Sequence, residues 1–144
     1  MDAKQTLEAQ RQLLARFWYL HVIMDCFTNL RGKTIHDEKG LFFRALQEYP
    51  DMVKHINAMP GLPKFTTGMI GVNTLRTVKE VAERLDSGQK WTTTLRGNMS
   101  ILLMNIEDYF LDLEVSPVNQ DHHLDIEKIK DDGLGEANFN MEHY

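Results

Sequence analysis

The length, composition and charge of the chain place it among globular proteins. Its 144 residues suffice for one domain with a single core, and 42% apolar with 26% charged residues exclude a mostly disordered chain, a collagen or a low-complexity array. The formal net charge is −5, so the chain lacks the excess of basic residues with which nucleic-acid-binding proteins neutralise phosphates.

An amphipathic pattern near the N-terminus predicts the first helix. Beyond Leu14 its polar residues are few and lie close to one strip, so neighbouring helices should enclose it and it should be the central helix. Gly32 suits the left-handed cap that ends it. Trp18 lies toward the polar strip, where an exposed tryptophan would be a strong interface anchor. The apolar positions that recur every three or four residues are Leu7, Leu13, Leu14, Phe17, Leu20, Met24, Phe27 and Leu30.

The longest apolar-rich run, residues 13–30, is interrupted by three polar or charged side chains. Arg16, His21 and Asp25 would be costly in hydrocarbon, so we expect a buried helix and no membrane association. No basic region followed by an apolar stretch is visible at the N-terminus. The lone Cys26 cannot form an intramolecular disulfide, and we therefore expect a reducing, cytoplasmic location.

Proline and glycine divide the middle of the chain. A second helix should begin with Asp37 as its N-cap and end at Pro50. A short helix over residues 51–59 should follow, and Pro60-Gly61-Leu62-Pro63 should stop it. A further helix is expected over residues 66–85.

The last long helix is predicted between Trp91 and Leu113, although β-branched residues and Gly97 could delay its start to Asn98. Trp91 is a second candidate interface anchor. The chain has eight methionines, which suit an adaptable core or a partner-binding groove, and we expect them in the core. Those that spread over several predicted helices are Met52, Met59, Met69, Met99 and Met104.

Acidic residues dominate the segment 116–144, which has seven of them against two lysines and so accounts for the whole net charge. Leu124, Ile126 and Ile129 predict a short docked helix, whereas the chain from Asp131 onward is expected to be a mobile end. We expect removal of this segment to leave the melting of the body largely unchanged. These patterns predict an all-α, single-domain bundle of four to five helices (residues 1–115) with a flexible, partly ordered acidic tail (residues 116–144).

Two segments match an Arg-x4-6-His spacing: Arg16 to His21, and Arg31 to His36. This spacing resembles the motif of HEPN ribonucleases, although Phe17 stands where that family usually has a polar residue. Roughly one such match is expected by chance in a chain with this many arginines and histidines. The resemblance implies an RNA-cleaving helical enzyme that uses Arg16 and His21 in paired protomers. The structural interpretation is that His21 and Asp25, one helical turn apart, form a hydrogen-bonded pair in a packed helix.

No residue pattern indicates a cofactor or a metal site. The side chains of Asp121-His122-His123-Leu124-Asp125 could bind a metal, but adjacent histidines on a tail diverge, and a pH-responsive patch is the alternative. Leu41-Phe42-Phe43 and Tyr49-Pro50 resemble the early helices of a globin. Neither 66–75 nor 95–103 contains a histidine that could ligate haem. We therefore expect no cofactor, no metal and no catalytic residue.

The sequence thus predicts a non-catalytic protein-interaction module: an assembly subunit, an adaptor or a small inhibitor. It would bind a protein partner or a second copy of itself through apolar helix faces and the acidic tail. The alternatives are the RNA-cleaving enzyme described above and an acidic inhibitor that mimics nucleic acid. Direct binding of nucleic acid is not expected. The predicted partner-binding residues are Trp18, Trp91, Asp121, His122, His123, Asp125, Asp131 and Asp132.

Overall fold

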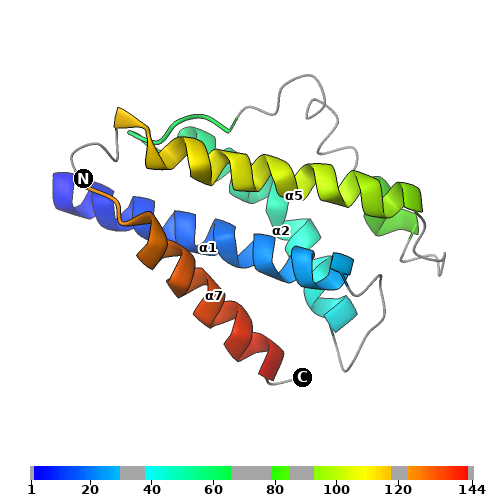
Figure 1. The fold of residues 1–144 in the computed structure, drawn as a ribbon. Coiled ribbons are helices and arrows are strands. Elements are labelled where there is room, and N and C mark those ends of the chain that lie inside the picture. Colours follow the sequence, from blue (N-terminus) through cyan, green and yellow to red (C-terminus); the bar gives the residue numbers. More distant parts are fainter. Residues whose placement is uncertain (1, 30–37, 66–78, 85–92, 118–122, 143–144) are drawn as a thin grey trace.

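The protein is an all-α bundle (Figure 1). The computed structural model describes residues 2–29, 38–65, 79–84, 93–117 and 123–142, and these ranges contain no strand. Residues 79–84 are helical, and no described helix is both long and apolar enough to cross a membrane. The helices with complete bounds are α1 (Ala3–Asn29), α2 (Glu38–Ala58), α5 (Thr93–Glu114) and α7 (Ile126–Glu142).

Helix α1 is central, as its sequence predicts. It packs against α2, α5 and α7, and Figure 1 shows α5 and α7 running along different sides of it. Its core side chains face these neighbours, and Leu14, Phe17, Leu20 and Met24 are fully buried. Burying large apolar side chains on several sides of one helix is what holds a bundle of this size together.

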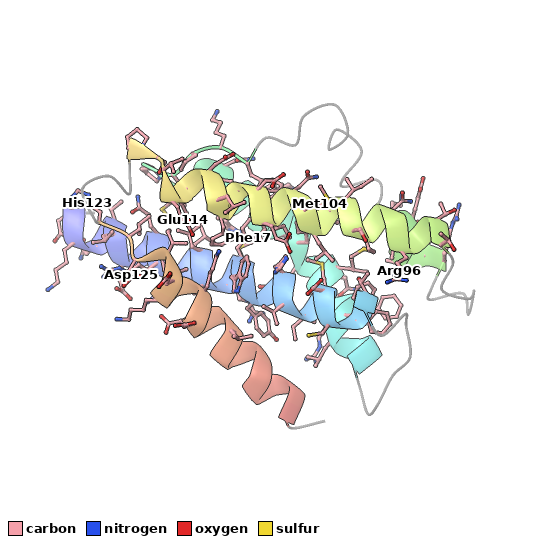
Figure 2. All side chains as sticks on the ribbon, viewed as in Figure 1. Phe17, Arg96, Met104, Glu114, His123 and Asp125 are labelled. Atoms are coloured by element: carbon pink, nitrogen blue, oxygen red, sulfur yellow. The ribbon has the colours of Figure 1, made fainter. Side chains whose placement is uncertain are left out.

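Aromatic rings from α1, α2 and α5 meet around Phe17 in the core (Figure 2). The Phe17 ring lies 6.2 Å from that of Tyr49, 6.1 Å from that of Tyr109 and 6.0 Å from that of Phe110, measured between centroids. Phe65 packs edge-on against Phe17 at 5.5 Å. Such offset and edge-to-face pairs stabilise the core beyond the area they bury.

Helix α2 continues through Pro50, so the prediction that it ends there is wrong. The buried side chains before and after the proline, Tyr49, Met52 and Ile56, keep the spacing of one helix face. An internal proline costs about 3 kcal/mol by removing a backbone hydrogen bond and crowding the preceding turn. Burial of this continuous stripe offsets that cost, because each fully buried apolar side chain contributes about 1.5–3 kcal/mol.

The stop expected at residues 60–63 is confirmed, and side chains from two other helices hold it. Gly61 has a φ of 83°, and Gln10 Nε2 in α1 donates a 2.7 Å hydrogen bond to the carbonyl of Pro60. Tyr109 in α5 donates through its hydroxyl to the carbonyl of Pro63 at 2.7 Å. The turn therefore joins the end of α2 to both α1 and α5.

Helix α5 begins at Thr93, before the later of the two starts that the sequence allows. Gly97 is accommodated inside it, and a Cβ at this position would meet no atom within 4 Å. The glycine therefore marks no close contact and no break in the helix.

Helix α7 is docked on α1. Asp125 caps its start, because Asp125 Oδ1 accepts a 3.1 Å hydrogen bond from the Lys128 backbone N–H. Leu124, Ile126 and Ile129 belong to the buried core, so the expected docked helix is confirmed. The structure extends this helix to Glu142, through residues that the sequence pattern assigned to the mobile end.

A close helix crossing accounts for the glycine inside this helix. Gly133 is buried, and a Cβ built on it would lie 2.6 Å from the carbonyl oxygen of Ala15 and 3.2 Å from Cβ of Trp18. The glycine that resembles a helix breaker in the sequence is instead the residue that lets the backbones of α7 and α1 approach.

Candidate functional site

Trp18, a predicted interface anchor, is half-buried where α1, α5 and α7 meet. Its ring stacks on that of His21 at 4.4 Å between centroids and packs edge-on against Phe110 at 5.0 Å. Lys130 Nζ in α7 lies 4.7 Å from the Trp18 ring centroid, within the range of a cation–π contact. Trp18 therefore joins three helices of its own chain.

Three other predicted partner-binding residues, Trp91, Asp121 and His122, lie outside the described residues. His123 and Asp125 form the start of α7: the backbone carbonyl of His123 accepts a 3.5 Å hydrogen bond from Arg11, and Asp125 is the helix cap. Asp131 and Asp132 are exposed on α7. The described members of the predicted set are thus spread over the α1–α7 contact and do not meet in one cluster.

His21 is buried and bonded to α5. Its Nε2 atom lies 3.0 Å from Glu107 Oε1, so Glu107 takes the place of Asp25, the hydrogen-bond partner that the helical spacing suggests. His21 Nδ1 is buried with no hydrogen-bond partner among the described residues. Burial lowers the pKa of His21 below its ordinary value, while the bond to Glu107 and the charges of Glu107 and Asp25 act against that shift.

Arg16, the other residue of the ribonuclease-like motif, is bonded to α2. Its Nε and Nη2 atoms donate to the two carboxylate oxygens of Glu48 at 2.8 and 2.7 Å, and its guanidinium lies 4.3 Å from the Tyr19 ring centroid. His21 is five positions after Arg16, which is about 140° around an α-helix. Arg16 therefore faces α2 while His21 faces α5, and one chain does not bring them together.

A pocket of about 620 Å³ lies between α1 and α7. Its charged lining mixes three basic with three acidic side chains, and two of the basic ones already have acidic partners: Arg16 with Glu48, and Arg11 with Glu8 at 3.7 Å. A lining with equal numbers of basic and acidic side chains favours neither anionic nor cationic ligands. Among the residues that the structure describes, no group of three His, Cys, Asp or Glu side chains could hold a metal ion. The residues that line the pocket are Glu8, Arg11, Gln12, Ala15, Arg16, Asp125, Lys128, Ile129 and Asp132.

The most distinctive surface is on α5, where large apolar side chains face away from the core. The described residues expose five large apolar side chains. Three of them are on α5, namely Ile101 (39% exposed), Met104 (57%) and Leu111 (56%), and a fourth, Val115 (74%), lies in the turn that directly follows the helix. Together with Asp108 they follow one another at steps of three or four residues, and the four residues on α5 form one stripe, about 80° wide on the helix surface. We call these five residues the outer stripe.

The outer stripe lies opposite the face of α5 that covers the core. Leu102, Ile106 and Leu113 are buried on that other face, and Figure 2 labels Phe17 in the core and Met104 on α5. A helix at the surface of a globular protein normally carries polar residues opposite its buried face. Helix α5 carries apolar residues on both.

Acidic side chains surround the outer stripe. Every charged residue from 97 to 115 is acidic. Glu107 on one flank is bonded to His21, and Glu114 lies 3.8 Å from Lys130. Asp108 within the stripe and Asp112 on its other flank are exposed and form no ion pair with any described residue.

This surface is not among the features predicted from the sequence. Met104 is predicted to lie in the core with the other methionines, whereas Met52 and Met99 are buried and Met104 is exposed. A signal was present: residues 101, 104, 108, 111 and 115 have the helical spacing of a second stripe, but the stronger core pattern on the same helix accounts for most of its apolar residues.

Comparisons of the chain with models of protein families, with curated proteins and with solved structures give no match.

Proposed function

We propose that this protein is a non-catalytic protein-interaction module and that a partner docks on the outer stripe of α5. The observation that carries the proposal is the exposure of Ile101, Met104 and Leu111 on one face of α5, with the exposed Val115 directly after the helix. Contiguous apolar groups at a surface are kept from water when another protein covers them, and such patches are typical of interaction sites.

The shape of the stripe suits a protein rather than a small molecule. Its part on α5, from Ile101 to Leu111, runs along about 15 Å of a convex helix surface, which offers no concavity to enclose a small ligand. A second helix can pack along such a stripe, because its own residues at steps of three and four match those of α5. The engagement of Arg16 by Glu48 and of His21 by Glu107 supports a role other than catalysis. We place this role in a reducing compartment, the cytoplasm, where a lone cysteine stays a free thiol.

The test is site-specific photo-crosslinking in native extract. A benzophenone amino acid at Met104 should give one defined crosslinked product, whereas the same group at Gln47, an exposed position on α2, should not give it. In the protein that carries the benzophenone group at Met104 (the Met104 reporter), the substitution Leu111→Glu should reduce the yield of the crosslinked product at least about tenfold, since it places a charge where an apolar contact forms. Gln47→Glu in the same reporter is the matched control and should leave the yield unchanged.

The mass of the product separates a second copy of the chain from a different protein. Circular dichroism of each variant shows that the bundle is intact, because both substituted side chains are exposed. A product that forms equally from Gln47, or that survives Leu111→Glu, would contradict docking on the outer stripe.

A further inference from the structure

We propose that the occupant of the outer stripe is a basic amphipathic helix of another protein. The inference rests on the proposed function and adds the chemistry of the partner. It is carried by the acidic residues on the stripe: Asp108 lies between Met104 and Leu111 within it, and Asp112 lies at its edge.

Asp108 decides the charge of the partner. Its carboxylate is exposed, has no ion pair among the described residues, and lies among apolar side chains that a docked helix would cover. Covering an ionised carboxylate without a cation is costly, whereas a lysine or arginine at the matching position keeps it paired. A neutral apolar helix is therefore disfavoured, and a helix with a cation in its apolar face is selected.

The flanks of the stripe point to the same partner. Asp112 follows Asp108 by one turn, so two cations one turn apart on the incoming helix would each meet a carboxylate. Glu107 lies on the opposite flank and keeps a negative charge beside the stripe. The partner thus carries large apolar residues at steps of three and four, with lysine or arginine within and beside them.

A second copy of this chain that docks through its own α5 does not fit these charges. Antiparallel pairing of two α5 helices centred on Asp108 would place one Asp108 against the other. Residues 97–115 contain no basic side chain that could face either carboxylate. Nucleic acid and anionic lipid surfaces are disfavoured as well, because both are negatively charged and would be repelled by the acidic side chains of α5.

The test uses two designed helical peptides of about four turns with the same leucine stripe, one with lysine flanks and one with glutamate flanks. Binding to the full-length protein is measured by fluorescence anisotropy at low and at physiological salt. The lysine peptide should bind at least about tenfold more tightly than the glutamate peptide, and less tightly as salt is raised. Asp108→Asn with Asp112→Asn should weaken the lysine peptide about tenfold and flatten its salt dependence.

A matched control removes the same charge from other helices. Asp51→Asn on α2 with Glu127→Gln on α7 should leave the affinity for the lysine peptide within about twofold, because both carboxylates are exposed and neither belongs to α5. An equal loss in this control would overturn the inference, since it would mean attraction to overall charge only. Equal affinity for the lysine and glutamate peptides would also overturn it.

The two proposals fail separately. If Leu111→Glu abolishes the binding of both peptides while the Asp108 and Asp112 variant changes nothing, the stripe docks a helix but selects no basic one. The further inference is then wrong and the proposed function stands. If Leu111→Glu leaves the affinity for the lysine peptide unchanged, the stripe is not the docking surface and both proposals are wrong.

Discussion

Single residues of this bundle take their properties from the helices that pack against them, and His21 is the clearest case. It is held by Glu107 of α5, lies near Asp25 of its own helix, and shares the Trp18 ring with Lys130 of α7. The two carboxylates favour the protonated imidazole, whereas burial and the lysine disfavour it, and burial dominates. The pKa of His21 is therefore lowered in the folded protein.

This lowering makes stability depend on pH. The unfolded chain takes up a proton on His21 as pH falls through about 6.5, while the folded protein stays neutral at that position until a lower pH. The contribution of His21 to stability is therefore complete above pH 6.5 and is lost as pH falls from there toward the pKa of the folded state.

Glu107→Gln tests this linkage. Glutamine can still hydrogen-bond to His21, so the free energy of unfolding at pH 7.5 should change by less than about 1 kcal/mol. The variant loses the charge that stabilises protonated His21, so its additional loss of stability at pH 5 should exceed that of the wild type. Urea unfolding at both pH values measures the difference. Asp108→Asn removes one neighbouring charge without touching His21 and should follow the wild type; parallel behaviour of the two variants would contradict the linkage.

At the scale of the element, the sequence predicts the long amphipathic segments well and their ends poorly. The pattern of α1 was sufficient to identify it as the central helix, because its polar residues lie in one narrow strip. Pro50 and Gly133 were misleading for one reason: the effect of a proline or a glycine on the stability of a helix depends on what packs against that position. Burial on both sides of Pro50 keeps α2 intact, and the backbone of α1 beside Gly133 makes glycine necessary there.

Gly133→Ala should loosen α7. The new Cβ would lie 2.6 Å from the carbonyl oxygen of Ala15, which is backbone and cannot turn aside, so α7 must shift away from α1. We expect a loss of about 1–3 kcal/mol in the free energy of unfolding. Gly135→Ala in the same helix is the matched control: its Cβ would meet nothing within 4 Å, and alanine should stabilise by up to about 1 kcal/mol.

Urea unfolding of the two alanine variants, side by side, decides the point. Opposite signs for the two positions are expected, because both gain the same helix propensity and only Gly133 meets a neighbouring backbone. Equal effects at Gly133 and Gly135 would show that α7 does not cross α1 as closely as the structure has it.

At the scale of the whole molecule, the fold class was predictable and the candidate site was not. Trp18 and Asp125 were selected because their residue types favour interfaces. Tertiary contacts instead engage Trp18 among three helices, and Asp125 caps α7 through a local hydrogen bond to the Lys128 backbone N–H. The outer stripe was not predicted because all the apolar residues of α5 were attributed to the one face that covers the core. Only the packing reveals that Met104 and Leu111 face away from the core.

The contribution of α7 to the whole fold reverses one expectation from the sequence. The charge count suggests an appendage whose removal leaves melting unchanged, yet Leu124, Ile126 and Ile129 are part of the same core as α1 and α5. At about 1.5–3 kcal/mol for each buried apolar side chain, their removal costs at least about 5 kcal/mol, which is comparable to the whole stability of many single domains.

Deletion of residues 116–144 should therefore lower the melting temperature sharply or leave the bundle unfolded at room temperature. Deletion of residues 136–144 alone should lower it less, because this shorter deletion keeps the buried side chains of Leu124, Ile126 and Ile129. Thermal unfolding followed by circular dichroism measures both. If the longer deletion melted like the full chain, the acidic segment would be an independent appendage. If it melts at a lower temperature, the first half of the segment is a structural helix of the bundle, which packs on α1 through apolar side chains and carries its negative charges on the outside.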